Sequence, residues 1–257
     1  MMNAAFRATG IDAVYLALRV SADRLGAVVR GLCACEIGGV NVTAPHKGTV
    51  GAFLDDLSST AKKTRSVNTI VFEDGRAVGH STDGEGLVGA IETETGTAIT
   101  GATILMIGAG GAARGVLPAL MEHRPGRINI TNRTEKRAAV LAGELDSDDI
   151  VGTLPLKTAE LAQAIRTADI VINATAIPIT TADFLGLDLL TMRAGALVFD
   201  MNYGTDTRAI RTLLKPRTIR YCDGLTMLLF QGFGSFRLWT RQEPPISDMR
   251  QALGLSS

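Results

Sequence analysis

The chain of 257 residues lacks several features that mark specialised classes of protein. Its 26 basic residues are balanced by 26 acidic ones, so it has no excess of positive charge for nucleic acid or an anionic membrane. No apolar run approaches the roughly 20 residues that span a bilayer. The start, Met1–Phe6, has neither the basic nor the apolar region of a secretory signal. We therefore expect a cytoplasmic protein with no nucleic-acid or membrane partner.

Cysteine is scarce, with Cys33, Cys35 and Cys222 as the three residues of this type. The spacing of Cys33 and Cys35 differs from that of a redox Cys-x-x-Cys motif, and no cluster of histidines lies near them in sequence to complete a zinc site. We interpret all three as reduced thiols that pack as small apolar side chains, and we expect no metal site.

Glycine is plentiful, with 28 residues, and this suits an α/β protein with many turns between strands and helices. From Thr103 onward, apolar segments predict strands at 103–107, 127–131, 150–153, 169–173, 196–200 and 218–222. Helical patterns lie between several of them, so this region predicts a doubly wound parallel sheet.

The first 92 residues show shorter elements, which predict a second and smaller α/β domain. The expected helices cover 3–10, 21–32, 47–57 and 82–92, and the expected strands cover 13–20, 37–42, 66–72 and 76–80. Asp74-Gly75 between the last two strands is a strong hairpin signal.

The polar, turn-rich stretch 93–101 predicts a linker between the domains. The apolar helical segment 225–239 is too long for another crossover, so we expect it to return to the first domain. The predicted organisation is a first domain over 1–92, a doubly wound domain over 93–224, and C-terminal helices over 225–257.

A glycine turn follows the strand Thr103–Ile107 and leads into an amphipathic helix over 114–123. Its sequence is Gly108-Ala-Gly110-Gly111-Ala-Ala113. The first glycine permits the sharp turn, and the second lets a phosphate approach without a Cβ in the way. Ala113 stands where a third glycine is usual and still allows close packing of helix and strand. The motif predicts a pyrophosphate held by the helix N-terminus.

The next strand, Arg127–Thr131, ends in Asn132-Arg133-Thr134. NAD-binding chains usually place an acidic residue there for the ribose hydroxyls. A guanidinium flanked by amide and hydroxyl groups suits a 2′-phosphate instead. The sequence therefore predicts NADP(H) rather than NAD as the cofactor.

Polar side chains also follow strands in the first domain, in Asn41-Val-Thr43-Ala-Pro-His-Lys47, Val67-Asn68-Thr69 and Ser81-Thr-Asp83-Gly84. Thr43, Asn68 and Asp83 can recognise hydroxyls, and Lys47 is the one cation that these segments offer.

Structural roles are the alternatives for these residues. Lys47 could be a solvated lysine at a helix start, Asp83 a helix N-cap and Asn68 a turn residue.

These motifs resemble, in order, those of the shikimate dehydrogenase (shikimate/quinate 5-dehydrogenase) family, and Asp200-Met-Asn-Tyr203 and Met227–Gly232 resemble its C-terminal signatures. The resemblance implies NADPH-dependent reduction of 3-dehydroshikimate to shikimate in aromatic amino-acid (chorismate) biosynthesis. It implies that 1–92 binds substrate and that 93–224 is a Rossmann domain that binds NADP, with a small hydroxy acid as substrate and a monomer or homodimer as the assembly. It also implies Lys47 and Asp83 as the catalytic pair, since a cation can stabilise the charge that forms on a ketone oxygen when hydride arrives.

The resemblance also implies two sets of binding residues. Those for the substrate are Thr43, Asn68, Asp83, Tyr203 and Gln231. Those for NADP(H) are Gly108, Ala109, Gly110, Gly111, Ala112, Asn132, Arg133, Thr134, Arg137, Ala174, Thr175, Met201 and Gly224.

The chain departs from the family pattern in four places. Members usually begin earlier, with a strand and a Ser-x-Ser motif that holds the substrate carboxylate. We therefore expect a small sheet without that strand and weak shikimate binding, through either truncation or a genuinely short protein. Ser81 replaces an asparagine, Ala176-Ile-Pro178 a Ser-x-Gly segment, and Thr226 a glycine.

Two alternative functions stay open. One is a quinate or aminoshikimate dehydrogenase, although Arg133 argues against the NAD-preferring quinate enzymes. The other is a weakly active or inactive relative that binds a nucleotide and acts as a sensor or interaction partner.

Overall fold

The computed structural model describes residues 1–35, 37–145 and 150–255 and divides the chain into two compact units. Unit 1 consists of Met1–Leu87 and Leu228–Ser257, and unit 2 consists of Val88–Met227. One division falls inside helix α4 (Asp83–Gly89), and the other falls near the start of helix α9 (Gly224–Thr240). The stretch 93–101, expected as a linker, belongs to unit 2, and Ile99 within it is fully buried.

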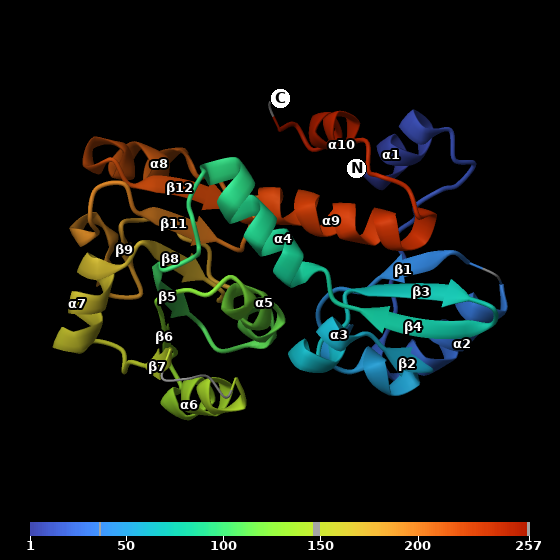
Figure 1. The fold of residues 1–257 in the computed structure, drawn as a ribbon, viewed down its shortest axis with the longest axis horizontal. Helices are drawn as coiled ribbons and strands as arrows, with labels where there is room; N and C mark the ends of the chain where they lie inside the picture. Colours follow the sequence, from blue (N-terminus) through green and yellow to red (C-terminus); the bar gives the residue numbers. More distant parts are fainter. Residues whose placement is uncertain (36, 146–149, 256–257) are drawn as a thin grey trace. The chain divides into compact units, whose positions relative to one another are not determined.

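Unit 2 is built on a six-stranded parallel sheet with the strand order β12-β11-β8-β5-β6-β7 (Figure 1). The strands are β5 (Thr103–Ile107), β6 (Arg127–Thr131), β7 (Val151–Thr153), β8 (Ile170–Asn173), β11 (Leu197–Asp200) and β12 (Arg220–Asp223). The helices beside them are α5 (Gly111–Glu122), α6 (Glu135–Glu144), α7 (Ala159–Thr167) and α8 (Arg208–Leu214). The predicted doubly wound parallel fold is confirmed.

The central strands of this sheet are buried on both faces, which explains why they are apolar at consecutive positions. Every residue of β8 and β11 is buried. A small hairpin of β9 (Asp183–Phe184) and β10 (Leu187–Asp188) was not predicted. Its turn residues Leu185 and Gly186 both have positive φ, the conformation of a tight two-residue hairpin loop.

Unit 1 contains a four-stranded mixed sheet with the order β1-β3-β4-β2. Its strands are β1 (Gly39–Asn41), β2 (Asp56–Leu57), β3 (Thr69–Glu73) and β4 (Arg76–His80), and its first helices are α1 (Met2–Thr9), α2 (Leu25–Ala34) and α3 (Ser59–Thr64). β3 and β4 form the antiparallel hairpin expected around Asp74-Gly75, and both turn residues have positive φ.

The strand expected at 13–20 is not formed. The backbone of Tyr15 forms hydrogen bonds with the side chain of Asn3 and not with another strand. The Asn3 side chain accepts from Tyr15 N (2.6 Å) and donates to Tyr15 O (3.0 Å). Val14, Leu16 and Leu18 are exposed. A strand requires a partner along its length, and local alternation of residue types does not supply one.

The helix expected at 47–57 is also wrong. The segment forms two short 3₁₀ turns, His46–Gly48 and Val50–Phe53, and then enters β2. Gly48 and Gly51 weaken helix propensity in this segment. Its last residues pair with β4 as strand β2 and so cannot be part of a helix.

Helix α9 carries the C-terminal part of the chain back into unit 1, and α10 (Ile246–Ala252) follows it. The indole N–H of Trp239 on α9 donates to Ile70 O in β3 (3.0 Å). Gly39 leaves room for this ring, because a Cβ there would overlap the indole. Phe236 and Met249 join Phe6 of α1 in a buried apolar cluster. The helix is therefore attached to the sheet by a polar contact and to α1 and α10 by apolar contacts.

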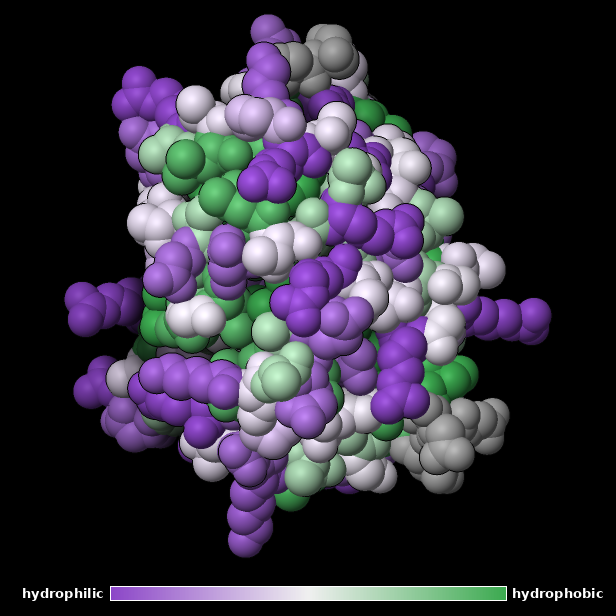
Figure 2. Space-filling model, turned by 90° about the vertical axis from the view of Figure 1, so that its left-hand side faces the viewer, coloured by the Kyte–Doolittle hydropathy of each residue, from purple (hydrophilic) through white to green (hydrophobic). Residues whose placement is uncertain are grey.

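The surface is mixed in character. Figure 2 shows a face on which hydrophilic side chains are interspersed with apolar ones. Of the helices that the structure describes, none has both the length and the apolar character needed to cross a membrane.

Candidate active site

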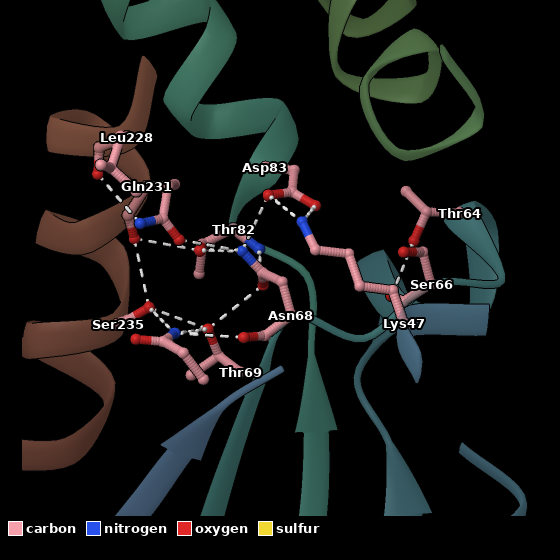
Figure 3. Close-up of polar contacts among 11 residues, drawn as sticks. Lys47, Thr64, Ser66, Asn68, Thr69, Thr82, Asp83, Leu228, Gln231 and Ser235 are labelled. Carbon is pink, nitrogen blue, oxygen red and sulfur yellow. Dashed lines mark hydrogen bonds and ion pairs between the residues drawn. The ribbon is translucent and has the colours of Figure 1, made fainter. Parts of the chain in front are cut away.

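A lysine and an aspartate form a close ion pair in unit 1 (Figure 3). Lys47 lies in the 3₁₀ turn beyond β1, and Asp83 is the first residue of α4. Lys47 Nζ is 2.7 Å from Asp83 Oδ2 and 3.0 Å from Oδ1. The aspartate side chain is 11% exposed and the lysine side chain 34%. The ammonium group is therefore held in one place while part of its side chain remains accessible.

Asn68 connects this pair to the rest of the site and is buried. Its Nδ2 atom lies 3.0 Å from Asp83 Oδ1, 2.9 Å from Thr82 Oγ1 and 3.1 Å from Gln231 Oε1. Its Oδ1 atom accepts from the backbone N–H of Thr82 (2.8 Å). A backbone N–H can only donate, so this contact establishes which end of the amide faces Asp83.

Gln231 reaches the site from α9. Thr82 Oγ1 donates to Gln231 O (3.0 Å), which connects the start of α4 to that helix. Gly234, on the next turn of α9, permits the close approach, because a Cβ there would lie 2.9 Å from Thr82 Cγ2. The structure thus brings together Lys47, Asn68, Asp83 and Gln231 among the substrate and catalytic residues predicted from sequence.

The other two predicted substrate residues lie outside this cluster of contacts. Thr43 is exposed in the loop after β1, where its carbonyl accepts from His46 N (2.9 Å). Tyr203 belongs to unit 2, where it follows β11 and is 55% exposed.

Sequence reasoning did not assign a role to four residues that contact this cluster. They are Asn41, Thr69, Thr82 and Ser235, which form hydrogen bonds with Asn68, with Gln231 or with each other. Thr69 and Thr82 adjoin predicted residues, and Ser235 is four positions after Gln231, on the same face of a helix. Proximity in sequence to the predicted residues was the signal by which these residues could have been found.

The glycine turn of unit 2 has the geometry of an anion site. Gly108 has φ +108°, and a Cβ there would lie 3.0 Å from the Ala174 carbonyl. Gly110 is the N-cap of α5 and makes no side-chain cap. A Cβ at Gly110 or Gly111 would meet nothing within 4 Å, so the start of the helix is open. The first N–H groups of a helix need partners from outside it, and a pyrophosphate fits this opening.

The turn after β6 presents cationic side chains. Asn132 shapes it, because its Oδ1 accepts from Ala109 N (3.3 Å) and its Nδ2 donates to Thr134 O (2.9 Å). Arg133 and Arg137 are exposed, and no acidic partner is found for either guanidinium within 1–35, 37–145 and 150–255. This arrangement fits the 2′-phosphate of NADP.

The remaining predicted cofactor residues lie along the same edge of the sheet. Parallel strands present their carboxyl ends at one edge, and the candidates follow β5, β6, β8, β11 and β12, which are neighbours in the strand order. The residues after β8, β11 and β12 are Ala174, Thr175, Met201 and Gly224.

Buried Asp200 organises the loop after β8. It accepts from Asn173 Nδ2 (2.9 Å) and from Ile179 N (2.6 Å), and so it holds both ends of the segment containing Ala176-Ile-Pro178.

Two of the departures from the family pattern are buried hydroxyls. The hydroxyl of Thr226 donates to Asp223 O (3.0 Å) inside unit 2. Ser81 Oγ is buried and has no hydrogen-bond partner among the described residues. Within the described ranges, no group of three or more His, Cys, Asp or Glu side chains could hold a metal ion.

Both units of the chain match known protein families. Residues 1–70 match the family model for the shikimate dehydrogenase substrate binding domain. Residues 91–185 match the model for shikimate / quinate 5-dehydrogenase, and residues 224–253 match the model for the shikimate 5′-dehydrogenase C-terminal domain. A shikimate dehydrogenase (NADP(+)) of Citrifermentans bemidjiense is 35% identical, and the match covers 98% of this chain and 88% of the relative.

Two solved structures have the same fold over nearly the whole chain. One is a shikimate 5-dehydrogenase of Thermus thermophilus in complex with NADP(H) and shikimate, with a TM-score of 0.86 at 28% identity over 98% of this chain and 92% of that one. The other is a quinate dehydrogenase of Corynebacterium glutamicum in complex with NAD, with a TM-score of 0.86 at 27% identity and the same coverage.

Proposed function

The chain belongs to the shikimate dehydrogenase family, and from this premise we propose that it reduces 3-dehydroshikimate to shikimate with NADPH. The observation that carries the proposal is the Lys47–Asp83 pair and its fixed contacts with Asn68. The reaction converts the ketone, NADPH and one proton into the alcohol and NADP⁺.

Lys47 serves as the general acid in this proposal. When bound, NADPH supplies the hydride for the ketone carbon. Negative charge develops on the carbonyl oxygen, and the Lys47 ammonium stabilises this charge and donates a proton to it. Asp83 holds Nζ through both carboxylate oxygens, so the ammonium need not reorient during the step.

Asn68 and Gln231 complete the recognition of the substrate. Asn68 Nδ2 donates to Asp83 Oδ1 (3.0 Å), and a ring hydroxyl of the substrate can replace this contact, accepting from the amide and donating to the carboxylate. Gln231 presents its own amide at Asn68 and adds a further polar group.

The edge of the unit 2 sheet binds the cofactor. The open N-terminus of α5 holds the pyrophosphate, and Arg133 and Arg137 hold the 2′-phosphate. The exposed guanidinium of Arg133 also favours NADP over NAD as the cofactor. It therefore favours shikimate over quinate as the substrate, since the quinate enzymes considered above prefer NAD.

The test is turnover by the purified chain with a matched set of substrates and cofactors. We expect oxidation of NADPH by 3-dehydroshikimate, a much slower reaction with NADH, and little oxidation of quinate in the reverse direction. Faster turnover of quinate or an aminoshikimate would replace the proposed substrate. Tight binding of NADPH without turnover of any of these compounds would support a nucleotide-binding relative instead.

A further inference from the structure

A buried chain of hydroxyl and amide groups lies behind Asn68, on the side away from Lys47 (Figure 3). We call Asn41, Thr69 and Ser235 the support cluster. Thr69 and Ser235 have no exposed surface. The three residues come from β1, from β3 and from α9, so three separate elements meet at this cluster.

The hydrogen bonds of the support cluster connect every member to the others. Asn41 Nδ2 lies 2.9 Å from Ser235 Oγ and 3.1 Å from Thr69 Oγ1, and the two hydroxyl oxygens are 2.8 Å apart. Tyr15 OH donates to Asn41 Oδ1 (3.0 Å), which orients the Asn41 amide so that its Nδ2 faces the hydroxyls.

The cluster ends on two atoms of the candidate active site. Thr69 Oγ1 donates to Asn68 Oδ1 (3.1 Å). This uses the one hydroxyl hydrogen of Thr69, so Ser235 is the donor in the 2.8 Å contact between the two hydroxyls, and Gln231 O, 3.2 Å from Ser235 Oγ, is the second acceptor for the same hydrogen. Asn68 Oδ1 therefore has two donors, Thr69 Oγ1 and the Thr82 backbone N–H. With both lone pairs engaged, the amide plane is restrained, and its Nδ2 atom faces Asp83, Gln231 and Thr82 Oγ1.

Ser235 completes the cluster. It is a small polar side chain in a helix segment that otherwise packs apolar residues, since Phe233 and Phe236 beside it are buried. Without the serine hydroxyl, Asn41 Nδ2 and Thr69 Oγ1 would each lose a buried hydrogen-bond partner. Such a loss costs more free energy than the loss of a partner at the surface, where water can replace it. Thr69 would then be free to turn its hydroxyl away from Asn68.

We propose that Ser235 is a positioning residue, which acts through Thr69 to hold the Asn68 amide against Asp83 in the geometry that the catalytic pair requires. The proposal deepens the function proposed above and rests on it. Ser235 does not touch Lys47 or Asp83 in this scheme, so its effect on the reaction passes through Asn68.

The first experiment compares three variants by kinetics. Ser235→Ala and Thr69→Val remove one hydroxyl each, and Thr69→Ser keeps it. We expect kcat with 3-dehydroshikimate to fall about five- to tenfold in the first two, the size of one lost buried hydrogen bond, and to recover in Thr69→Ser. The Kd for NADPH should not change in any of them.

Thr240→Val is the matched control. Its hydroxyl also donates to the carbonyl four residues earlier on α9 (2.8 Å), but it lies outside the support cluster. The control should keep wild-type kcat. If Ser235→Ala and Thr69→Val lower the melting temperature and leave kcat unchanged, the cluster is only structural and the proposal is wrong.

A double-mutant cycle separates positioning from a general effect on the fold. Ser235→Ala should cause no further loss of kcat in an Asn68→Ala background, because the residue it positions is gone. Independent, multiplying losses would overturn the proposal.

Side-chain hydrogen exchange of Asn68, followed by NMR, provides a readout that does not depend on turnover. The Nδ2 hydrogens should exchange faster in Ser235→Ala than in the wild type. If the wild type does not reduce 3-dehydroshikimate, the proposed function fails, and the exchange rates still decide whether Ser235 orders Asn68. Unchanged exchange would refute the positioning role in either case.

Discussion

The Nζ atom of Lys47 lies within hydrogen-bond distance of both carboxylate oxygens of Asp83, although 36 positions separate the two residues in sequence. The lysine follows β1 and the aspartate begins α4, so the pair forms only when the unit 1 sheet is assembled. This relationship gives the ammonium a defined direction without burying it.

Lys47→Ala tests the general-acid role directly. We expect kcat for 3-dehydroshikimate to fall about 10²–10⁴-fold, the usual contribution of a positioned acid, and the Kd for NADPH to change little. Lys62→Ala is the control, because Lys62 pairs with Asp56 on the surface of the same unit. Undiminished kcat in Lys47→Ala would remove the proposed mechanism.

Arg133→Ala tests the cofactor preference. Loss of a charge-assisted hydrogen bond to the 2′-phosphate should weaken NADPH binding about ten- to a hundredfold and leave NADH binding almost unchanged. Lys136→Ala, an exposed cation three positions away, should affect neither. Titration of both cofactors measures the effect, and equal losses for NADPH and NADH would assign Arg133 a structural role.

Two glycines of the turn should respond differently to alanine. A Cβ at Gly110 has open space, so Gly110→Ala should keep the wild-type melting temperature and weaken NADPH and NADH binding together by blocking the pyrophosphate. Gly108→Ala should lower the melting temperature as well, because Gly108 has positive φ and contacts the Ala174 carbonyl. Unchanged affinity in a folded Gly110→Ala variant would place the pyrophosphate elsewhere.

Gly39→Ala tests the packing of α9 on the unit 1 sheet. The added methyl group would displace the Trp239 indole from its hydrogen bond to Ile70 O, and we expect a loss of about 1–3 kcal/mol in the free energy of unfolding. Gly38→Ala is the matched control on the preceding residue, where a Cβ meets nothing within 4 Å. Denaturant unfolding of both variants gives the comparison, and equal stabilities would contradict the packing argument.

The pH dependence of stability should contain a contribution from His80. Burial, and then the charge of Arg241, lowers the pKa of this imidazole below its ordinary value of 6.5. As the pH falls below 6.5, the unfolded chain takes up a proton that the folded chain binds only at lower pH, so the free energy of unfolding decreases.

His80→Gln should flatten this part of the profile, measured by urea unfolding across the pH range above and below 6.5. An identical profile in the variant would show that other groups dominate. The contribution of His80 is absent well above that pH, where both states are neutral.

Local sequence was sufficient for most of unit 2. Its strands are short apolar runs, and all of them except β8 are followed by an α-helix, the alternation from which a parallel sheet is built. The glycine turn between β5 and α5 and the Asp74-Gly75 hairpin were also readable, since the backbone conformations of Gly108, Asp74 and Gly75 are properties of a few neighbouring residues.

Local sequence failed where pairing or packing from a distance decides the outcome. The alternating pattern at 13–20 predicts a strand, but the backbone of Tyr15 bonds to the side chain of Asn3 instead. At 47–57, competition between helix and strand pairing was resolved in favour of β2. The first result does not follow from residue types within its segment, and the second follows from them only in part, since Gly48 and Gly51 weaken helix propensity there.

The residue types of the candidate site can be read from the sequence, namely an amine, a carboxylate and two amides at the ends of predicted elements. How these groups meet depends on the fold, because Asn68 contacts Gln231 across 163 positions and Asn41 contacts Ser235 across 194. A motif specifies which side chains are present. The packing of α9 on the sheet buries their donors and acceptors together, and it therefore decides which of them form hydrogen bonds with each other. Ser235 therefore acquires its contacts only in the folded unit.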